Sequence, residues 1–233
     1  MYRVLSVVCL LLMMSAPAAA QTSEWVAGTH YTVLASPQPT GMKPGEVQVL
    51  EFFSYTCKTC YRLEPSLQEW VHDSPAYVRT VQVPVVWDER HRTFARLHYA
   101  LEQLQRPDLH QALRELLHGN RGALVSASEA DTLAQLRGFV TQHGIAAGDF
   151  DRAYGAPAVL AKVQQAEALM AKYQIIATPT LVINGKYSVR PSQALGRVMP
   201  EDKNQYFVPL FSVTAELVAR EHGAPPAQAA ALH

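Results

Sequence analysis

The chain has 233 residues, and its 20 Lys and Arg balance its 20 Asp and Glu, so the formal charge is zero when the histidines are neutral. This balance argues against a general nucleic-acid binder. Hydrophobic residues make up 48% and charged residues 17%, which excludes a largely disordered or coiled-coil chain and fits one domain, or one domain with an insertion.

Residues 1–20 have the pattern of a cleaved export signal. Arg3 supplies a positive charge, residues 4–14 are uncharged, and residues 15–20 end in small side chains. A bilayer span needs about 20 apolar residues, and no stretch of the chain approaches that length. We therefore expect an exported protein that begins near Gln21 and has no stable membrane insertion. A lipid anchor on Cys9 is the alternative, although Cys9 lies inside the apolar run rather than after it.

Residues 47–53 (VQVLEFF) are apolar and β-prone, and a short polar turn separates them from Cys57. Apolar residues then recur every three or four positions to about residue 71, which predicts a helix that Pro65 bends or complicates. Cys57 would begin this helix, and Cys60 would lie one turn inside it. The first sulfur could then face solvent while the second lies toward the core.

Cys57 and Cys60 are the two cysteines left after signal cleavage, and export implies an oxidising setting. A disulfide across two residues closes too short a loop to stabilise the fold much. A zinc site needs four ligands, and the chain has neither a second cysteine pair nor a suitably spaced histidine pair. A structural disulfide and a metal site remain alternatives, but we favour a chemical role and predict no metal.

Cys57 is the candidate nucleophile, because the free N–H groups and dipole of a helix N-terminus favour a thiolate. The dipole contributes about 0.3–1 kcal/mol, less than one pKa unit, so a strongly acidic thiol needs further donors. Lys58 could add a cation and Thr59 a hydroxyl or backbone donor, unless both simply face water. Cys60 would be the resolving thiol that attacks a mixed disulfide on Cys57.

Glu51 is the acid within the strand at 47–53 and shares a face with Val49 and Phe53. Either that face is wet or the acid is buried, and we favour burial because the neighbours are apolar. A buried Glu51 would have a raised pKa and could exchange a proton with Cys60.

The rest of the chain alternates helical and strand patterns. Residues 77–86 predict a strand that Pro84 ends or places at an edge. Four apolar stripes predict helices near 94–104, 109–117, 128–144 and 158–173, with Ser128 as an N-cap and Gly144 as a terminator. Residues 180–183 predict a strand, Asn184-Gly185 a type I′ turn, and 207–218 a last helix. The nine histidines show no ligand spacing, and we expect most of them at the surface.

The segment VLEFFSYTCKTCYRLEP, residues 49–65, resembles the active-site segment of the thioredoxin superfamily and most closely that of the DsbA family of exported thiol oxidases. ATPTLVINGKY at 177–187 resembles the family loop in which a cis-proline faces the disulfide. GTHYTVL at 28–34 resembles the family's opening strand. By this resemblance Thr178 and Pro179 are substrate-binding residues: Pro179 is cis, and Thr178 pairs with the substrate backbone.

The resemblance implies an α/β thioredoxin-like fold with an inserted helical domain. We expect a thioredoxin-like domain from 21–87 and 158–223, a helical insertion at 88–157 and a flexible tail at 224–233. The implied activity is that of a periplasmic dithiol-disulfide oxidoreductase that donates the Cys57-Cys60 disulfide to reduced, unfolded secreted proteins. The implied partner is a quinone-linked membrane oxidase of the DsbB kind. We expect a monomer without a bound cofactor.

One departure concerns the residues between the cysteines, which are Lys58-Thr59 where the family typically has Pro-His. Loss of the histidine should weaken the oxidising strength, and Lys58 could partly restore it. The competing functions are a reductase or isomerase, a glutathione-using enzyme on a related fold, and a non-catalytic peptide-binding chaperone. A peptide-binding role for Tyr55 and Tyr61 is as plausible as a packing role.

Overall fold

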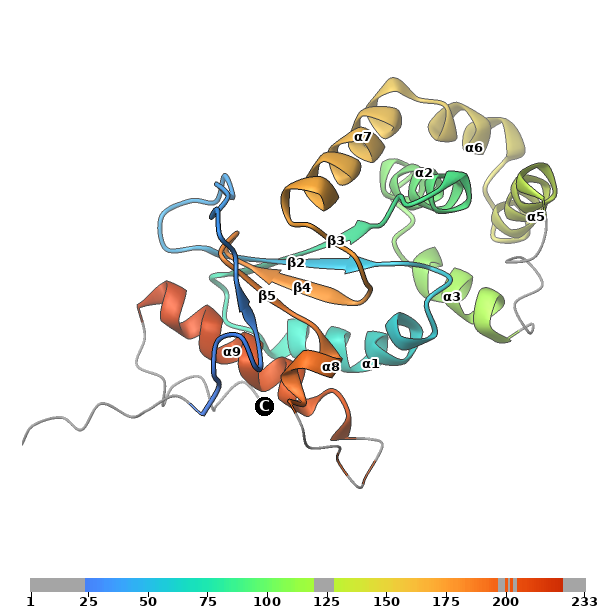
Figure 1. Cartoon of the computed structure of the whole chain (residues 1–233). Coiled ribbons are helices and arrows are strands. Elements are labelled where there is room, and N and C mark those ends of the chain that lie inside the picture. Colours follow the sequence, from blue (N-terminus) through green and yellow to red (C-terminus); the bar gives the residue numbers. More distant parts are fainter. Residues whose placement is uncertain (1–23, 120–127, 197–199, 201, 203–204, 224–233) are drawn as a thin grey trace, which may run out of the picture.

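A five-stranded mixed sheet is the centre of the part of the chain described by this computed structural model, residues 24–119, 128–196, 200, 202 and 205–223 (Figure 1). The strands lie in the order β1-β5-β4-β2-β3. Their bounds are Thr32–Val33 (β1), Val47–Phe53 (β2), Val78–Pro84 (β3), Thr180–Ile183 (β4) and Tyr187–Val189 (β5). Strand β2 runs parallel to β3 and antiparallel to β4. The expected signal at 1–20 and tail at 224–233 lie outside the described residues.

Strand β2 supplies apolar side chains to both faces of the sheet because successive residues point in opposite directions. Val47 and Val49 pack with helices α1 (Lys58–Asp73) and α9 (Val208–His222). Leu50 and Phe52 pack on the other face with α7 (Pro157–Lys172). Helices therefore cover both faces, as Figure 1 shows. By the same alternation, Glu51 belongs to the face that α1 covers.

The described residues between β3 and β4 are mainly helical. In addition to α7 it contains α2 (Glu89–Gln103), α3 (Leu109–Gly119), α5 (Glu129–Gln142) and α6 (Ala147–Tyr154). These four helices form a separate apolar core that also includes Phe53, Tyr55 and Cys60. The helical insertion therefore packs against the end of β2 and the start of α1.

The sequence predicted most of these elements. Strands β2 and β4 have the predicted bounds, and Pro84 ends β3. Ser128 caps α5 as expected, and its Oγ accepts the N–H of Asp131 at 3.2 Å. Asn184 and Gly185 both have positive φ, 47° and 65°, as a type I′ turn requires.

Three features differ from the expectation. The opening strand is reduced to the two residues of β1, and helix α6 and the four-residue helix α8 (Pro191–Ala194) were not predicted. Helix α6 has eight residues, too few to display a clear helical period in the sequence. Within the described ranges, no helix is long and apolar enough to cross a membrane.

Candidate active site

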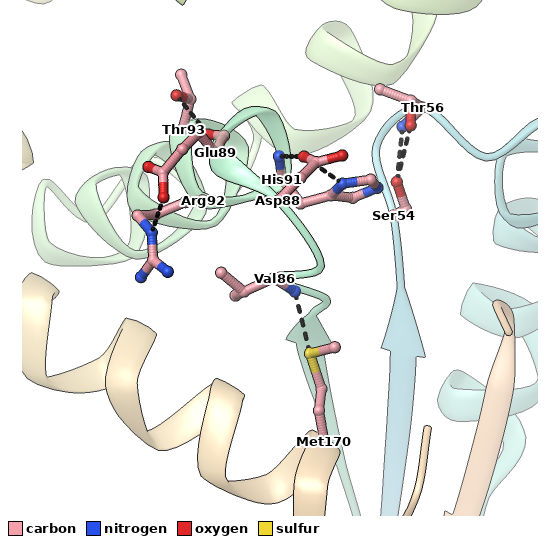
Figure 2. A network of polar contacts seen from close by, with 9 residues as sticks. All are labelled: Ser54, Thr56, Val86, Asp88, Glu89, His91, Arg92, Thr93 and Met170. Carbon is pink, nitrogen blue, oxygen red and sulfur yellow. Dashed lines mark hydrogen bonds and ion pairs between the residues drawn. The ribbon is translucent and has the colours of Figure 1, made fainter. Parts of the chain in front are cut away.

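Cys57 is the N-cap residue of α1, and a short turn connects it to β2. Its backbone is extended, with φ −83° and ψ 113°, and its Sγ accepts the N–H of Cys60 at 3.2 Å. The turn is held by the Ser54 and Thr56 hydroxyls, which lie 3.0 Å apart (Figure 2), and by the Cys57 N–H, which donates to Ser54 O at 3.1 Å. The sequence pattern predicted this strand, turn and helix correctly.

The two thiols have unequal environments. Cys57 is partly exposed, whereas Cys60 is 2% exposed and belongs to the core shared with the helical insertion. A hydrogen bond from the Cys60 side chain is the main influence that lowers the pKa of Cys57 to about 6. Burial opposes this decrease, and the Thr178 side chain and the N–H groups of Cys60 and Thr59 support it. Burial raises the pKa of Cys60 well above its ordinary value, and the proximity of Cys57 raises it further.

The loop before β4 lies beside Cys57. The Thr178–Pro179 peptide bond is cis, as the family resemblance implied. The Cys57 thiol lies 3.5 Å from the carbonyl oxygen of Thr178, 121 residues away in sequence. The cysteine pair and this loop therefore lie side by side, as the resemblance implied.

Glu51 is fully buried, so of the two alternatives weighed from the sequence the buried one is correct. Its Oε2 accepts from Gln82 Nε2 at 2.7 Å, while Oε1 has no hydrogen-bond partner among the described residues. Burial and the nearby Glu64 carboxylate raise the pKa of Glu51 to about 7, although Gln82 and Arg114 partly offset the increase. Glu51 is therefore a buried acid that can change protonation near neutral pH.

Glu64 and Arg114 form a buried ion pair that the sequence analysis did not predict. Glu64 Oε1 is 3.1 Å from Arg114 Nη1. The sequence did contain a signal for each residue. Glu64 lies four positions after Cys60, so it shares the buried face of its helix, and Arg114 lies four positions after His110 and three before Leu117. A charged residue on such a face is expected to have a partner.

His98 and His110 are exceptions to the expectation that most histidines lie at the surface, because both are buried. The Tyr55 hydroxyl lies 3.1 Å from His98 Nδ1 and 2.6 Å from His110 Nδ1, and burial lowers the pKa of His110 to about 3. Tyr55 is therefore a packing residue. Tyr61, which is partly buried, stacks on His118, with ring centroids 4.6 Å apart.

The residues between the cysteines contribute unequally. The Thr59 N–H is among the groups that lower the pKa of Cys57, whereas Lys58, which is exposed, is not among the main ones. Exposed apolar side chains lie near the cis-proline loop: Ile176 is 80% exposed, and Trp87, 44% exposed, donates its ring N–H to Ile175 O at 3.3 Å. Asp88 is the N-cap of the neighbouring helix α2, and its carboxylate accepts the backbone N–H of His91 at 2.9 Å (Figure 2).

Comparison with known proteins gives relatives that share one name. No family model matches the chain. The chain is 31% identical over 170 residues to the thiol:disulfide interchange protein DsbA of Pseudomonas aeruginosa, a match that covers 72% of this chain and 77% of the relative. It is 30% identical over 162 residues to the protein of that name from Bordetella parapertussis, covering 70% and 74%.

Similar solved structures carry the same name as these relatives. The crystal structure of Pseudomonas aeruginosa DsbA matches with a TM-score of 0.73 and 26% identity, over 85% of this chain and 95% of that one. The oxidoreductase DsbA from Xylella fastidiosa matches with a TM-score of 0.70 and 28% identity, over 85% and 98%. The agreement covers the sheet together with its inserted helices.

Proposed function

Because this chain belongs to the DsbA family of thiol:disulfide interchange proteins, we propose that it donates a Cys57–Cys60 disulfide to reduced, incompletely folded secreted proteins. The protein is a thiol:disulfide oxidoreductase with a thioredoxin-like fold and a helical insertion. In the proposed direction it is an oxidase, since the client loses two electrons and the enzyme's disulfide gains them.

The proposed reaction has two exchange steps. A client thiolate attacks Cys57 Sγ, the bond between Cys57 and Cys60 breaks, and Cys60 leaves with the electron pair and takes up a proton. A second client thiolate then attacks the client sulfur of the mixed disulfide, and Cys57 leaves as a thiolate. The client gains one disulfide, and the enzyme is left with a Cys57 thiolate and a Cys60 thiol.

The opposite pKa shifts of the two cysteines are the observation that supports this direction. The pKa of Cys57 is lowered to about 6, and that of Cys60 is raised. A stabilised Cys57 thiolate favours the reduced enzyme and makes Cys57 a good leaving group. A disulfide whose reduced form is stabilised is readily given to another dithiol.

The surrounding residues have supporting roles in the proposal. Glu51 exchanges a proton with Cys60, because its pKa of about 7 lets it act as donor or acceptor near neutral pH. Thr178 and cis-Pro179 bind the client backbone beside Cys57. Thr59 supports the Cys57 thiolate through its N–H, and Lys58 adds a positive charge at the surface.

The proposed compartment is the periplasm. Residues 1–20 fit an export signal, and a dithiol left by each turnover requires an oxidising partner. A quinone-linked membrane oxidase of the DsbB kind would restore the disulfide. We propose a monomer without a bound cofactor, because the sulfur pair carries the electrons.

The test is the equilibrium of the purified pair with glutathione, combined with oxidation of a reduced, unfolded disulfide protein. We expect the enzyme to oxidise this client, the C57S variant to be inactive, and K58A, which keeps both sulfurs, to remain active. Full activity of C57S would favour a peptide-binding chaperone, and full activity of C60S would favour a glutathione-using enzyme. Trapping of the thiols in cells should find the pair mainly oxidised, since a mainly reduced pair would identify a reductase or isomerase.

A further inference from the structure

Arg114 brings a positive charge from the helical insertion to the region beneath the cysteine pair. It belongs to α3, and its guanidinium Nη1 lies 3.1 Å from Glu64 Oε1 in α1. The side chains of this pair are 3% and 5% exposed. The guanidinium also lies over the rings of Phe53 and Tyr55, 5.0 and 5.5 Å from their centroids. The ion pair therefore joins the insertion to the helix that carries both cysteines.

Gln82 extends this contact to Glu51. Its amide oxygen accepts from Arg114 Nη2 at 3.3 Å, and its amide nitrogen donates to Glu51 Oε2 at 2.7 Å and to Glu64 Oε2 at 3.3 Å. A side-chain amide has one acceptor end and one donor end. Because the cation holds the oxygen, the NH₂ group is directed toward both carboxylates.

The two carboxylates interact with each other and with the sulfurs. Glu64 raises the pKa of Glu51, whereas Arg114 lowers it. Charge interactions also link Glu51 to Cys57 and to Cys60. A buried ion pair adds little net stability compared with apolar side chains of similar volume, so stability alone is a weak reason for a buried arginine here.

We propose that Arg114 is a positioning residue for disulfide transfer, which orients Gln82 and offsets the charge of the Glu51–Glu64 pair so that Glu51 can exchange a proton with Cys60. The inference rests on the proposed function and deepens it. When a client thiolate attacks Cys57 Sγ, the S–S bond breaks and Cys60 receives its electron pair. Glu51 then gives its proton to Cys60 and becomes a carboxylate, and a proton from solvent restores the acid later.

The proton affinity of Glu51 depends on charged and titratable groups from several elements. Glu64 and Cys57 from around α1 and Arg114 from α3 act on Glu51 directly, and Glu51 acts in turn on Cys60. Further groups interact with Arg114, namely Tyr55 in the turn, His98 in α2 and His110 in α3, and Glu102 in α2 interacts with these three. Among them Arg114 is the permanently charged cation, since a guanidinium does not lose its proton in proteins.

The experiment compares the carboxyl titrations of the wild type and of the R114Q, R114K and R96Q variants. The glutamate side-chain carbons of the reduced protein are followed by NMR against pH, with E51Q used to assign the Glu51 signal. In R114Q the carboxylate pair should take up a proton at a pH about one unit higher than in the wild type, while R114K should restore the wild-type value. The matched control is R96Q, which removes a partly buried arginine of the insertion that contacts Tyr154 rather than the carboxylates.

A second comparison avoids an unpaired buried carboxylate. E64Q/R114Q removes both charges of the ion pair, and its Glu51 should titrate about one unit higher than in E64Q alone. This comparison decides the question if R114Q does not fold. For R114Q against the wild type, and for E64Q/R114Q against E64Q, the pH profile of the rate at which the oxidised protein accepts electrons from a reduced dithiol peptide should shift upward as the carboxyl titration does.

Equal Glu51 titrations in E64Q and E64Q/R114Q would overturn the proposal. A titration shift in R96Q as large as the shift in R114Q would also overturn it. A shifted titration with an unchanged pH profile of transfer would also overturn it, because Arg114 would then have no influence on the reaction. Failure of the proposed function is separate: the wild type would then not oxidise the peptide at all, whereas the titration of the reduced protein would still report the effect of Arg114 on the carboxylates.

Discussion

The hydrogen bond from Cys60 to Cys57 can be tested by removing its donor. The pKa of Cys57 is about 6 against an ordinary value of 9.0, and the Cys60 side chain is the main cause. A hydrogen bond to a charged group contributes about 1.5–3 kcal/mol, which corresponds to about one or two pKa units. In the C60A variant, Cys57 should therefore titrate between about pH 7 and 8. It should not return to its ordinary value, because the N–H of residue 60 and the Thr178 side chain still support the thiolate.

The assay is the absorbance of the thiolate at about 240 nm in the reduced protein as a function of pH, with the rate of alkylation by iodoacetamide as an independent measure. C60S is the matched control, because serine keeps a donor at the same place and should titrate closer to the wild type than C60A does. The reasoning is refuted if C60A titrates at the wild-type pH, or if C60S shifts as far as C60A.

Three further predictions concern single substitutions. Burial raises the pKa of Glu51 to about 7, so its ionisation destabilises the folded state as the pH rises above about 4.5. In urea unfolding, the free energy of unfolding of E51Q should therefore exceed that of the wild type by up to about 3 kcal/mol at pH 8 and by nothing at pH 4. Y55F, which removes the hydroxyl between two buried histidines, should cost about 1–3 kcal/mol in the same assay and leave the Cys57 titration unchanged. K58A should move the Cys57 midpoint by less than about half a pKa unit, since Lys58 is exposed; a larger shift would contradict that view of its position.

The local part of the fold could be predicted because each signal lies within one segment. Apolar β-prone runs bounded by turn residues fixed β2 and β4, and Ser128 marked the start of α5. The cysteine spacing, together with the strand before it, indicated a partly exposed first thiol and a buried second one. These features follow from periodicity and capping, which require no knowledge of distant residues.

The polar interior of the site could not be predicted because its members come from distant segments. Periodicity places Arg114 on a buried face but does not say that Glu64 is its partner. Likewise the sequence does not say that His98 and His110 lie together beside the Tyr55 hydroxyl, because the three residues come from separate segments. Pairing between helices, and between a helix and a strand, is set by tertiary packing.

The groups that lower the pKa of Cys57 lie mainly outside the side chains of Lys58 and Thr59. The main contributions come from the Cys60 side chain, the Thr178 side chain and backbone N–H groups, and none of these requires a particular side chain at 58 or 59. The helix start and the cis-proline loop therefore stabilise the thiolate by themselves. Lys58-Thr59, where the family resemblance implies Pro-His, leaves these contributions in place, and the proposed disulfide donation depends on the thiolate that they stabilise.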